Sequence, residues 1–195
     1  MVYDGILIGL AVGLLRGGIR YGLKQFSSLH IRGGLVFPLL LVLQFVMFGL
    51  TERSSAAAAL SGSFFLAVYA AGLYVLWLNR RLYGFPFIFA GVLLNFLVMA
   101  VNGGRMPVSL EAANVLGPYY VDLLKTGSAV TKHYLMDSAT RLPFLGDIIP
   151  LSSPYPRTQV ISAGDIVINA GIFLYLQHLL VPDKRNGKTF EAEAK

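Results

Sequence analysis

Residues Phe85–Asn102 read FPFIFAGVLLNFLVMAVN, a stretch that carries no charged side chain. An α-helix of about 20 apolar residues matches the thickness of the hydrocarbon core of a bilayer. In such a core each backbone polar group needs a partner within its own segment, and a helix provides one. This stretch therefore predicts a membrane-spanning helix.

Four further stretches have the same apolar character, and together they predict an all-α integral membrane protein with about five transmembrane helices. They are Tyr3–Ile19, Leu35–Leu50, Ala57–Leu78 and Val160–Val181. The first stretch is interrupted by Arg16. It can still span the bilayer if Arg16 and Arg20 reach the head groups through their aliphatic stems. The alternative is a helix that lies in the membrane interface. Asp4 stands where a cleavable signal peptide would have basic residues, so no such signal is expected.

The composition excludes most soluble classes of protein. Hydrophobic residues make up 55% of the 195 residues and charged residues 13%, against roughly a quarter charged in an ordinary soluble domain. A globule of this size cannot bury that much apolar surface. The absence of cysteine excludes disulfides, thiol nucleophiles, zinc–thiolate sites and iron–sulfur clusters.

Basic residues between the predicted helices orient the chain, because short cytoplasmic loops are rich in Lys and Arg. They are Arg16, Arg20, Lys24, Arg32, Arg80, Arg81, Lys184, Arg185, Lys188 and Lys195. With five spans these regions fall on one side, so we expect the N-terminus outside and the C-terminus in the cytoplasm. The prediction is a multi-pass protein of the bacterial cell (plasma) membrane. Its membrane domain covers residues 1–181, and residues 182–195 form a disordered cytoplasmic tail.

An insert of residues 103–159 between the fourth and fifth spans is too long for a plain connector. Ser109–Leu116 predicts a short helix capped by Ser109 and ended by Gly117–Pro118. Tyr119–Asp137 has apolar positions at helical spacing, which predicts a second, amphipathic helix. Thr140–Pro156 is rich in proline and predicts irregular structure. The insert is thus expected to form an extracytoplasmic helical cap.

Glycines recur at every fourth position of the first span, at Gly5, Gly9, Gly13 and Gly17. Such a face lets another helix backbone approach closely. Packing within the chain is one interpretation, and a homo-oligomer or membrane-subunit interface is the other. The amides at membrane depth, Gln44, Asn95, Asn102 and Asn169, either bond to one another or line a polar cavity.

Two motifs bracket the insert and provide the candidate site residues. The first motif is Asn102-Gly103-Gly104-Arg105-Met106-Pro107, and it offers amide and guanidinium donors. Asn102 and Arg105 are therefore predicted ligand-binding residues. Asn169, in the fifth span, is the third predicted ligand-binding residue. The alternative for this motif is a helix-ending turn with a snorkelling arginine.

Asp147 and Asp165 are the predicted catalytic residues. Two aspartates held close together share a proton, so that one acts as a base on water while the other polarises a carbonyl. Asp165 also fits a capping box with Ser162, since a carboxylate is favoured at a helix N-terminus. For Asp147 the alternatives are a turn residue or a partner of Arg105.

The chain resembles a family of small bacterial multi-pass membrane proteins known only as a domain of unknown function. The residues that carry this resemblance are Asn102–Pro107, Gly146–Pro150 and the run from Ser162 through Asp165 to Gly171. The resemblance covers most of the chain and implies no activity.

The last third is also similar, more distantly, to lipoprotein signal peptidases, which are aspartyl proteases of the membrane. Asp147 and Asp165 stand at places comparable to the two catalytic aspartates of that family, which implies hydrolysis near the outer face. Ile161 and Ser162 stand where the family has Phe-Asn, and Gly164 replaces an alanine.

The sequence thus predicts an outer-face polar site that engages a lipid-linked or membrane-peptide ligand, with a membrane aspartyl hydrolase as its enzymatic form. Whether the protein is an enzyme stays open. The alternative is a non-catalytic structural or assembly subunit of a bacterial membrane complex, and a small-molecule transporter is third.

No cofactor and no metal are expected. His30, His133 and His178 lie on opposite membrane sides in the predicted topology, and no glycine-rich phosphate loop follows a strand. The expected partner is the lipid bilayer rather than nucleic acid.

Overall fold

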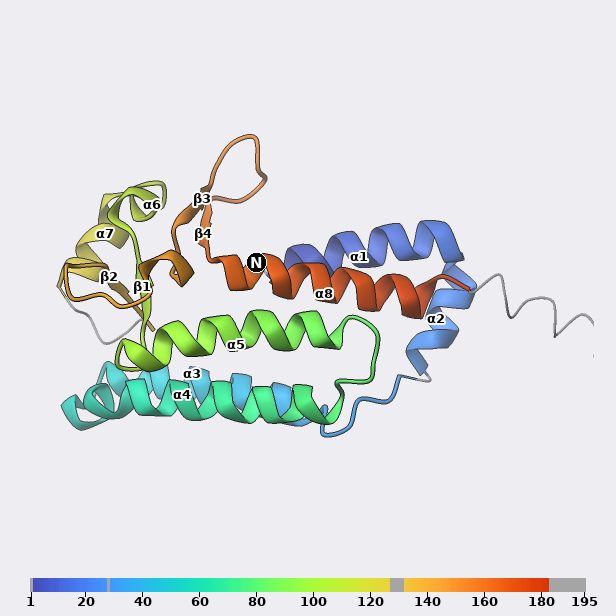
Figure 1. Cartoon of the computed structure of the whole chain (residues 1–195), viewed down its shortest axis with the longest axis horizontal. Coiled ribbons are helices and arrows are strands. Elements are labelled where there is room, and N and C mark those ends of the chain that lie inside the picture. The colour runs from blue at the N-terminus through green and yellow to red at the C-terminus, as the bar shows by residue number, and fades with distance from the viewer. Residues whose placement is uncertain (1, 28, 127–131, 183–195) are drawn as a thin grey trace, which may run out of the picture.

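The computed structural model describes residues 2–27, 29–126 and 132–182. Eight α-helices dominate this part of the chain (Figure 1): α1 (Val2–Gly17), α2 (Ile19–Ser27), α3 (Val36–Thr51), α4 (Ser55–Leu78), α5 (Phe85–Val101), α6 (Leu110–Asn114), α7 (Pro118–Lys125) and α8 (Ala163–Leu180). The other elements are β1 (Met106–Val108), β2 (His133–Leu135), the 3-10 turn η1 (Pro143–Leu145), β3 (Ile149–Leu151) and β4 (Gln159–Ile161). The tail that was predicted to be disordered lies almost wholly outside the described residues.

The five apolar stretches of the sequence are all helices, namely α1, α3, α4, α5 and α8. Two of them, α4 and α8, are long and apolar enough to cross a membrane, and α3 and α5 are shorter apolar helices. The first stretch ends earlier than expected, because Gly18 adopts a φ of 83° that few other residues tolerate. A separate amphipathic helix, α2, follows it, which the sequence analysis did not predict.

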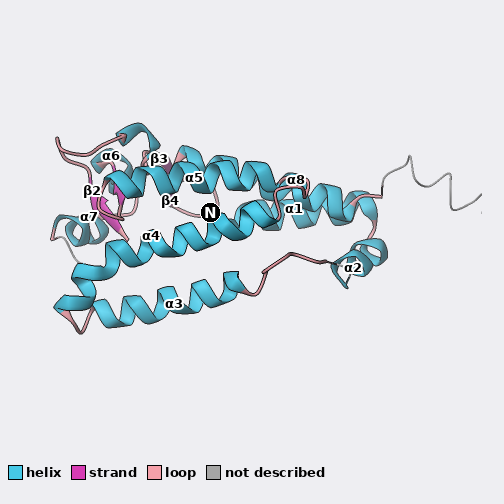
Figure 2. Ribbon diagram, turned by 60° about the horizontal axis from the view of Figure 1, so that its bottom comes forward, coloured by secondary structure: helices cyan, strands magenta, loops and turns pink. Residues whose placement is uncertain are grey.

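The long helices lie alongside one another in the order α3, α4, α5, α8, α1, each in contact with the next. In both ribbon views the α3–α4 turn and the insert lie at one end of this row. The α4–α5 turn, α2 and the end of α8 lie at the other end (Figure 2). The end that holds the insert therefore differs from the end that holds the arginine-rich loops.

The glycine face of α1 packs against α8 of the same chain. A Cβ at Gly9 would lie 2.8 Å from Cδ1 of Leu176, and a Cβ at Gly13 would lie 2.7 Å from Cδ1 of Leu180. Packing within the chain accounts for the glycine spacing. An additional homo-oligomer or membrane-subunit interface on α1 stays a prediction.

The insert folds into short helices and two small sheets, and these strands were not expected in the helical cap. Strands β1 and β2 pair in parallel, with Met106 opposite His133, and β3 and β4 pair antiparallel. The predicted helix over Tyr119–Asp137 is wrong in its length. Helix α7 ends at Lys125, and residues 133–135 form β2, because the buried strand β1 offers them a backbone partner.

Two apolar clusters hold the insert together and attach it to the helices. Val108, Ala113, Val121 and Leu124 form the core of the insert itself. Met106 of β1 packs with Phe65 of α4 and with Val98 and Met99 of α5. The insert is therefore anchored on the α4–α5 pair through β1.

The close contact between α5 and α8 can be tested with two glycines that differ in their surroundings. In Gly91→Ala the new Cβ would lie 2.7 Å from Cγ1 of Ile168 and 2.8 Å from its backbone nitrogen, whereas at Gly72 nothing lies within 4 Å. We expect Gly91→Ala to lower the free energy of unfolding by about 1–3 kcal/mol through overpacking. Gly72→Ala should leave it unchanged or raise it by up to ~1 kcal/mol, because alanine favours the helix. Thermal unfolding in detergent, followed by the fluorescence of Trp77, measures the difference, and equal melting temperatures would contradict the close approach.

Candidate functional site

The side chain of Asn102 ties the insert to the end of α5. Its Nδ2 donates to the carbonyl oxygens of Val98 at 2.7 Å and Arg141 at 2.8 Å. Its Oδ1 accepts a hydrogen bond of 2.9 Å from the backbone nitrogen of Arg141. Both polar groups of the amide are thus used in holding the chain, and the ligand-binding role of Asn102 stays a prediction.

Arg105 points to α4 rather than to either aspartate. Its Nη2 donates to Oγ of Ser61 at 3.2 Å, and Ser61 is fully buried. Gly103 and Gly104 have φ angles of 68° and 81°, which lets the chain turn closely against Gly62 of α4. Among the described residues Arg105 and Asp147 form no ion pair, so the structure does not bear out the interpretation of Asp147 as a partner of Arg105.

Asp165 and Ser162 form the predicted capping box at the start of α8. Asp165 Oδ2 accepts from the backbone nitrogen of Ser162 at 3.1 Å, and Oδ1 accepts from Nδ2 of Asn95 at 3.1 Å. Ser162 Oγ in turn donates to Oδ1 of Asn95 at 2.9 Å. Because Asn95 is only 2% exposed, this network satisfies an amide that would otherwise be buried without partners.

Asn169 links α8 to the start of α1. Its Nδ2 donates to the carbonyl oxygen of Asp165 at 2.9 Å, and its Oδ1 accepts from the backbone nitrogen of Gly5 at 2.7 Å. That nitrogen lies in the first turn of a helix, where the backbone has no partner of its own. These bonds explain the residue structurally, and its role in ligand binding stays a prediction.

Asp147 differs from these residues because part of its carboxylate has no hydrogen-bond partner among the described residues. Its backbone extends the sheet beside β1, with its nitrogen 2.9 Å from the carbonyl oxygen of Pro107. The residue is 6% exposed, and Oδ2 lies 3.4 Å from Nε2 of His133. Oδ1 is buried and accepts no hydrogen bond from the described residues. A buried carboxylate oxygen without a donor is costly, so this atom marks a place where a ligand could bind.

Charged and aromatic groups interact with Asp147 or with its neighbour Lys132, and we call Tyr69, Tyr120, Lys132, His133 and Asp147 the cap site. Nζ of Lys132 lies 5.9 Å from the ring centre of Tyr69. Tyr69 raises the pKa of Lys132 most, burial opposes that effect, and the carboxylates of Asp147 and Asp165 raise the pKa further. Burial, and secondarily Asp147, raises the pKa of the Tyr120 hydroxyl. Both directions favour the protonated forms, an ammonium at Lys132 and a neutral hydroxyl at Tyr120.

The sequence analysis missed Tyr69, Tyr120, Lys132 and His133 as site residues. Tyr69 belongs to α4, Tyr120 to α7, and Lys132 directly precedes β2. These three elements meet only in the folded chain, and Lys132 and His133 were assigned to a helix in which they had no special place. No spacing in the sequence identifies this group.

The two aspartates do not hydrogen-bond to each other in the part of the chain that the structure describes. Both oxygens of Asp165 already accept hydrogen bonds, whereas Asp147 keeps one oxygen without a partner. Lys132 interacts favourably with both carboxylates. A nearby ammonium favours two ionised carboxylates, whereas a catalytic pair needs one of them protonated. The geometry thus fits binding at Asp147 better than a shared proton, and catalysis by the pair stays a prediction.

The Asn102 contacts predict a local opening of the insert when they are removed. In Asn102→Ala three hydrogen bonds are lost, each worth about 1 kcal/mol, so the segment around Arg141 should open more often. Because Arg141 is exposed, brief trypsin digestion followed by mass spectrometry should find cleavage after Arg141 at least tenfold faster than in the wild type. Asn114→Ala, at an exposed position that ends α6, is the control and should be cut like the wild type. Unchanged cleavage of Asn102→Ala would show that the amide does not hold the segment.

Comparison with known proteins gives a family and a relative. The model of a family described as "Family of unknown function (DUF5317)" matches residues 28–177. An "Uncharacterized protein" from Thermotoga maritima is 31% identical over 175 residues, which cover 90% of this chain and 89% of the relative. No solved structure matches. These matches confirm the resemblance carried by the motifs around Asn102, Asp147 and Asp165: the chain belongs to the DUF5317 family.

Proposed function

We propose that the protein is a multi-pass membrane protein in which α1, α3, α4, α5 and α8 cross the bilayer. The exposed apolar side chains of α3 support this proposal: Leu39, Leu41, Val42, Phe45 and Val46 are each more than half exposed. A monomeric soluble protein rarely exposes a continuous apolar surface of this kind. Lipid tails would cover it without any partner protein.

The orientation follows from the two ends of the helix row. The insert lies at one end, and the loops with Arg32, Arg80 and Arg81 lie at the other. Since basic loops stay in the cytoplasm, the insert forms an extracytoplasmic cap and the C-terminus is cytoplasmic.

Single cysteines can test this orientation, because the natural chain has none. Phe144 in η1 and Tyr83 in the α4–α5 turn are both exposed, at 63% and 55%, so Phe144→Cys and Tyr83→Cys should fold normally. In intact spheroplasts a membrane-impermeant maleimide should label Phe144→Cys and leave Tyr83→Cys unlabelled. Permeabilisation should make both reactive. The opposite pattern would place the cap in the cytoplasm and end the proposal of an outer-face site.

We propose further that the cap site binds a lipid-linked or membrane-peptide ligand at the outer face. The observation that carries this proposal is the buried Oδ1 of Asp147, which accepts no hydrogen bond from the described residues. An amide, hydroxyl or ammonium group of a ligand would supply the missing donor. Lys132 and the hydroxyls of Tyr69 and Tyr120 would offer donors to the acceptor atoms of the same ligand.

The enzymatic form of this function is aspartyl hydrolysis, as the resemblance to lipoprotein signal peptidases implies. It would use Asp147 and Asp165 on a peptide bound beside α8. It requires one carboxylate to be protonated in the complex, and hence a ligand that draws Lys132 away from the pair.

A non-catalytic subunit is the second candidate, and the hydrogen bonds of Asn102, Asp165 and Asn169 favour it. All three side chains hold one segment of the chain to another. In this reading the cap site too serves to hold the insert, and a partner subunit would use another surface. A small-molecule transporter is the third candidate.

Substitution of Asp147 separates these candidates. A synthetic acylated peptide is incorporated into nanodiscs that hold the wild type, Asp147→Asn, Asp165→Asn or Asp122→Asn, and native mass spectrometry reports bound and cleaved peptide. A hydrogen bond to a charged group contributes about 1.5–3 kcal/mol, so Asp147→Asn should weaken binding by about 10- to 100-fold. Asp122 is exposed on α7, and its variant should bind like the wild type.

The outcomes of this experiment are distinct. Cleavage by the wild type that is lost in both Asp147→Asn and Asp165→Asn would establish the hydrolase. Binding without cleavage would establish the binding function. Equal binding by the wild type and Asp147→Asn would contradict the cap site as the ligand site and leave the subunit candidate.

A further inference from the structure

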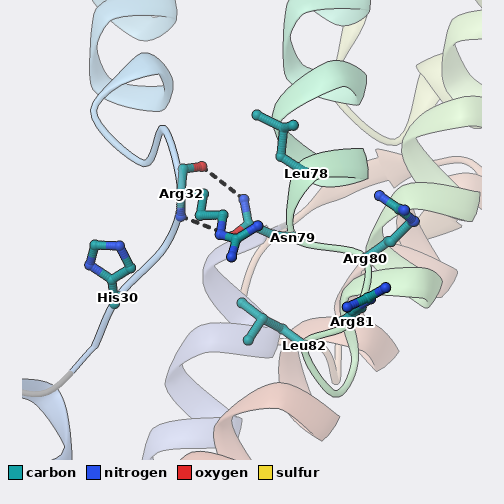
Figure 3. A pocket seen from close by; sticks show the side chains of 7 residues that line it. All are labelled: His30, Arg32, Leu78, Asn79, Arg80, Arg81 and Leu82. Atoms are coloured by element: carbon teal, nitrogen blue, oxygen red, sulfur yellow. Dashed lines mark hydrogen bonds between the residues drawn. The ribbon is translucent and has the colours of Figure 1, made fainter.

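A polar cavity lies at the end of the helix row opposite to the insert, and Figure 3 shows the residues that line it. It has a volume of about 350 Å³, and its polar lining comes from His30, Arg32, Asn79, Arg80 and Arg81. His30 and Arg32 belong to the segment between α2 and α3, and the other three residues follow the end of α4. Two segments far apart in the sequence therefore form its walls.

Asn79 fixes the geometry of this cavity. Its Oδ1 accepts from the backbone nitrogen of Arg32 at 2.9 Å, and its Nδ2 donates to the carbonyl oxygens of Arg32 and Val75, both at 2.8 Å. The residue is 4% exposed. Asn79 thus holds the backbone of Arg32 against the end of α4, and the Arg32 side chain projects from a fixed point (Figure 3).

The described residues that line the cavity carry positive charge and no negative charge. Arg80 is held on its own helix end, with its guanidinium 4.4 Å from the ring centre of Trp77 and Nη1 donating to the carbonyl oxygen of Trp77 at 2.9 Å. In the described part of the chain, neither Arg32 nor Arg81 forms an ion pair, and no Asp or Glu lines the cavity. Two guanidinium groups are therefore available to a ligand.

We propose that this cavity binds a phosphate group. Guanidinium groups match phosphate oxygens with paired hydrogen bonds and stay charged at every physiological pH. Cavities of this kind, placed between membrane helices at the cytoplasmic surface, suit anionic head groups. The proposal goes beyond the cap site and uses none of its residues.

Two sources could supply the phosphate, a lipid head group or a free phosphate compound, and the apolar rim favours the lipid. Leu78 and Leu82 line the cavity next to the arginines, and Leu78 and Trp77 are exposed. An acyl chain could lie against these side chains while its head group reaches Arg32 and Arg81. A soluble phosphate would gain nothing from them.

Native mass spectrometry of the full chain, released from nanodiscs of mixed phosphatidylglycerol and phosphatidylcholine, tests the proposal. The wild type should retain phosphatidylglycerol in preference to phosphatidylcholine. The double variant Arg32→Gln/Arg81→Gln should lose that preference by about tenfold or more. The control, Arg53→Gln/Arg141→Gln, removes the same charge from exposed positions near the other end of the molecule and should retain phosphatidylglycerol like the wild type.

A third variant and a competitor complete the experiment. Asn79→Ala removes no charge but releases Arg32, so it should also lose the preference while its melting temperature shows that the chain is folded. Competition by millimolar inorganic phosphate or glycerol 3-phosphate would identify a soluble source, and no competition would identify the lipid. An unchanged preference in Arg32→Gln/Arg81→Gln, or an equal loss in the control pair, would overturn the proposal.

Discussion

The contact between α5 and α8 determines the rest of the structure. Gly91 and Gly164 let the two backbones approach closely, so that Asn95 reaches the capping box of Ser162 and Asp165. Asn95 is buried, and its amide would be costly without these partners if α8 began elsewhere. The network thus sets where α8 begins, and therefore where the chain leaves the insert and returns to the helices.

Features that depend on local sequence were predictable. The five long helices were predicted from the lengths of the apolar stretches. The N-caps at Ser109 and Ser162 were predicted because each side chain bonds to a backbone nitrogen three residues later. Features that depend on distant partners were not predictable. Strand β2 exists because Met106, far away in the sequence, offers it a backbone partner. Arg105 was expected near a carboxylate, and its actual partner, Ser61, lies on another helix.

The same limit explains the candidate site. Asp147 and Asp165 were singled out as a pair, yet their surroundings differ. Asp165 has both oxygens satisfied by the structure that it stabilises, so folding alone accounts for it. Asp147 is buried, and one of its oxygens accepts no hydrogen bond from the residues that the structure describes, an arrangement that costs stability. Such a cost is typical of a group kept for binding, and Lys132, which balances its charge, could be recognised only in the folded chain.

The two polar regions differ in charge, and this difference bears on what each could do. The cap site contains a cation, Lys132, and a carboxylate, Asp147, which suits a ligand with donors and acceptors. Among the described residues that line the cavity at Arg32 and Arg81, basic side chains are present and acidic ones are not, which suits an anion. Between the two ends, α4 and α5 meet through buried apolar side chains such as Phe65, Val98 and Met99. A path for a polar solute would need polar side chains along its length. The contacts of Phe65, Val98 and Met99 provide none. The arrangement therefore fits the proposal of two separate binding sites, one at each end of the helix row, better than the proposal of a path for transport.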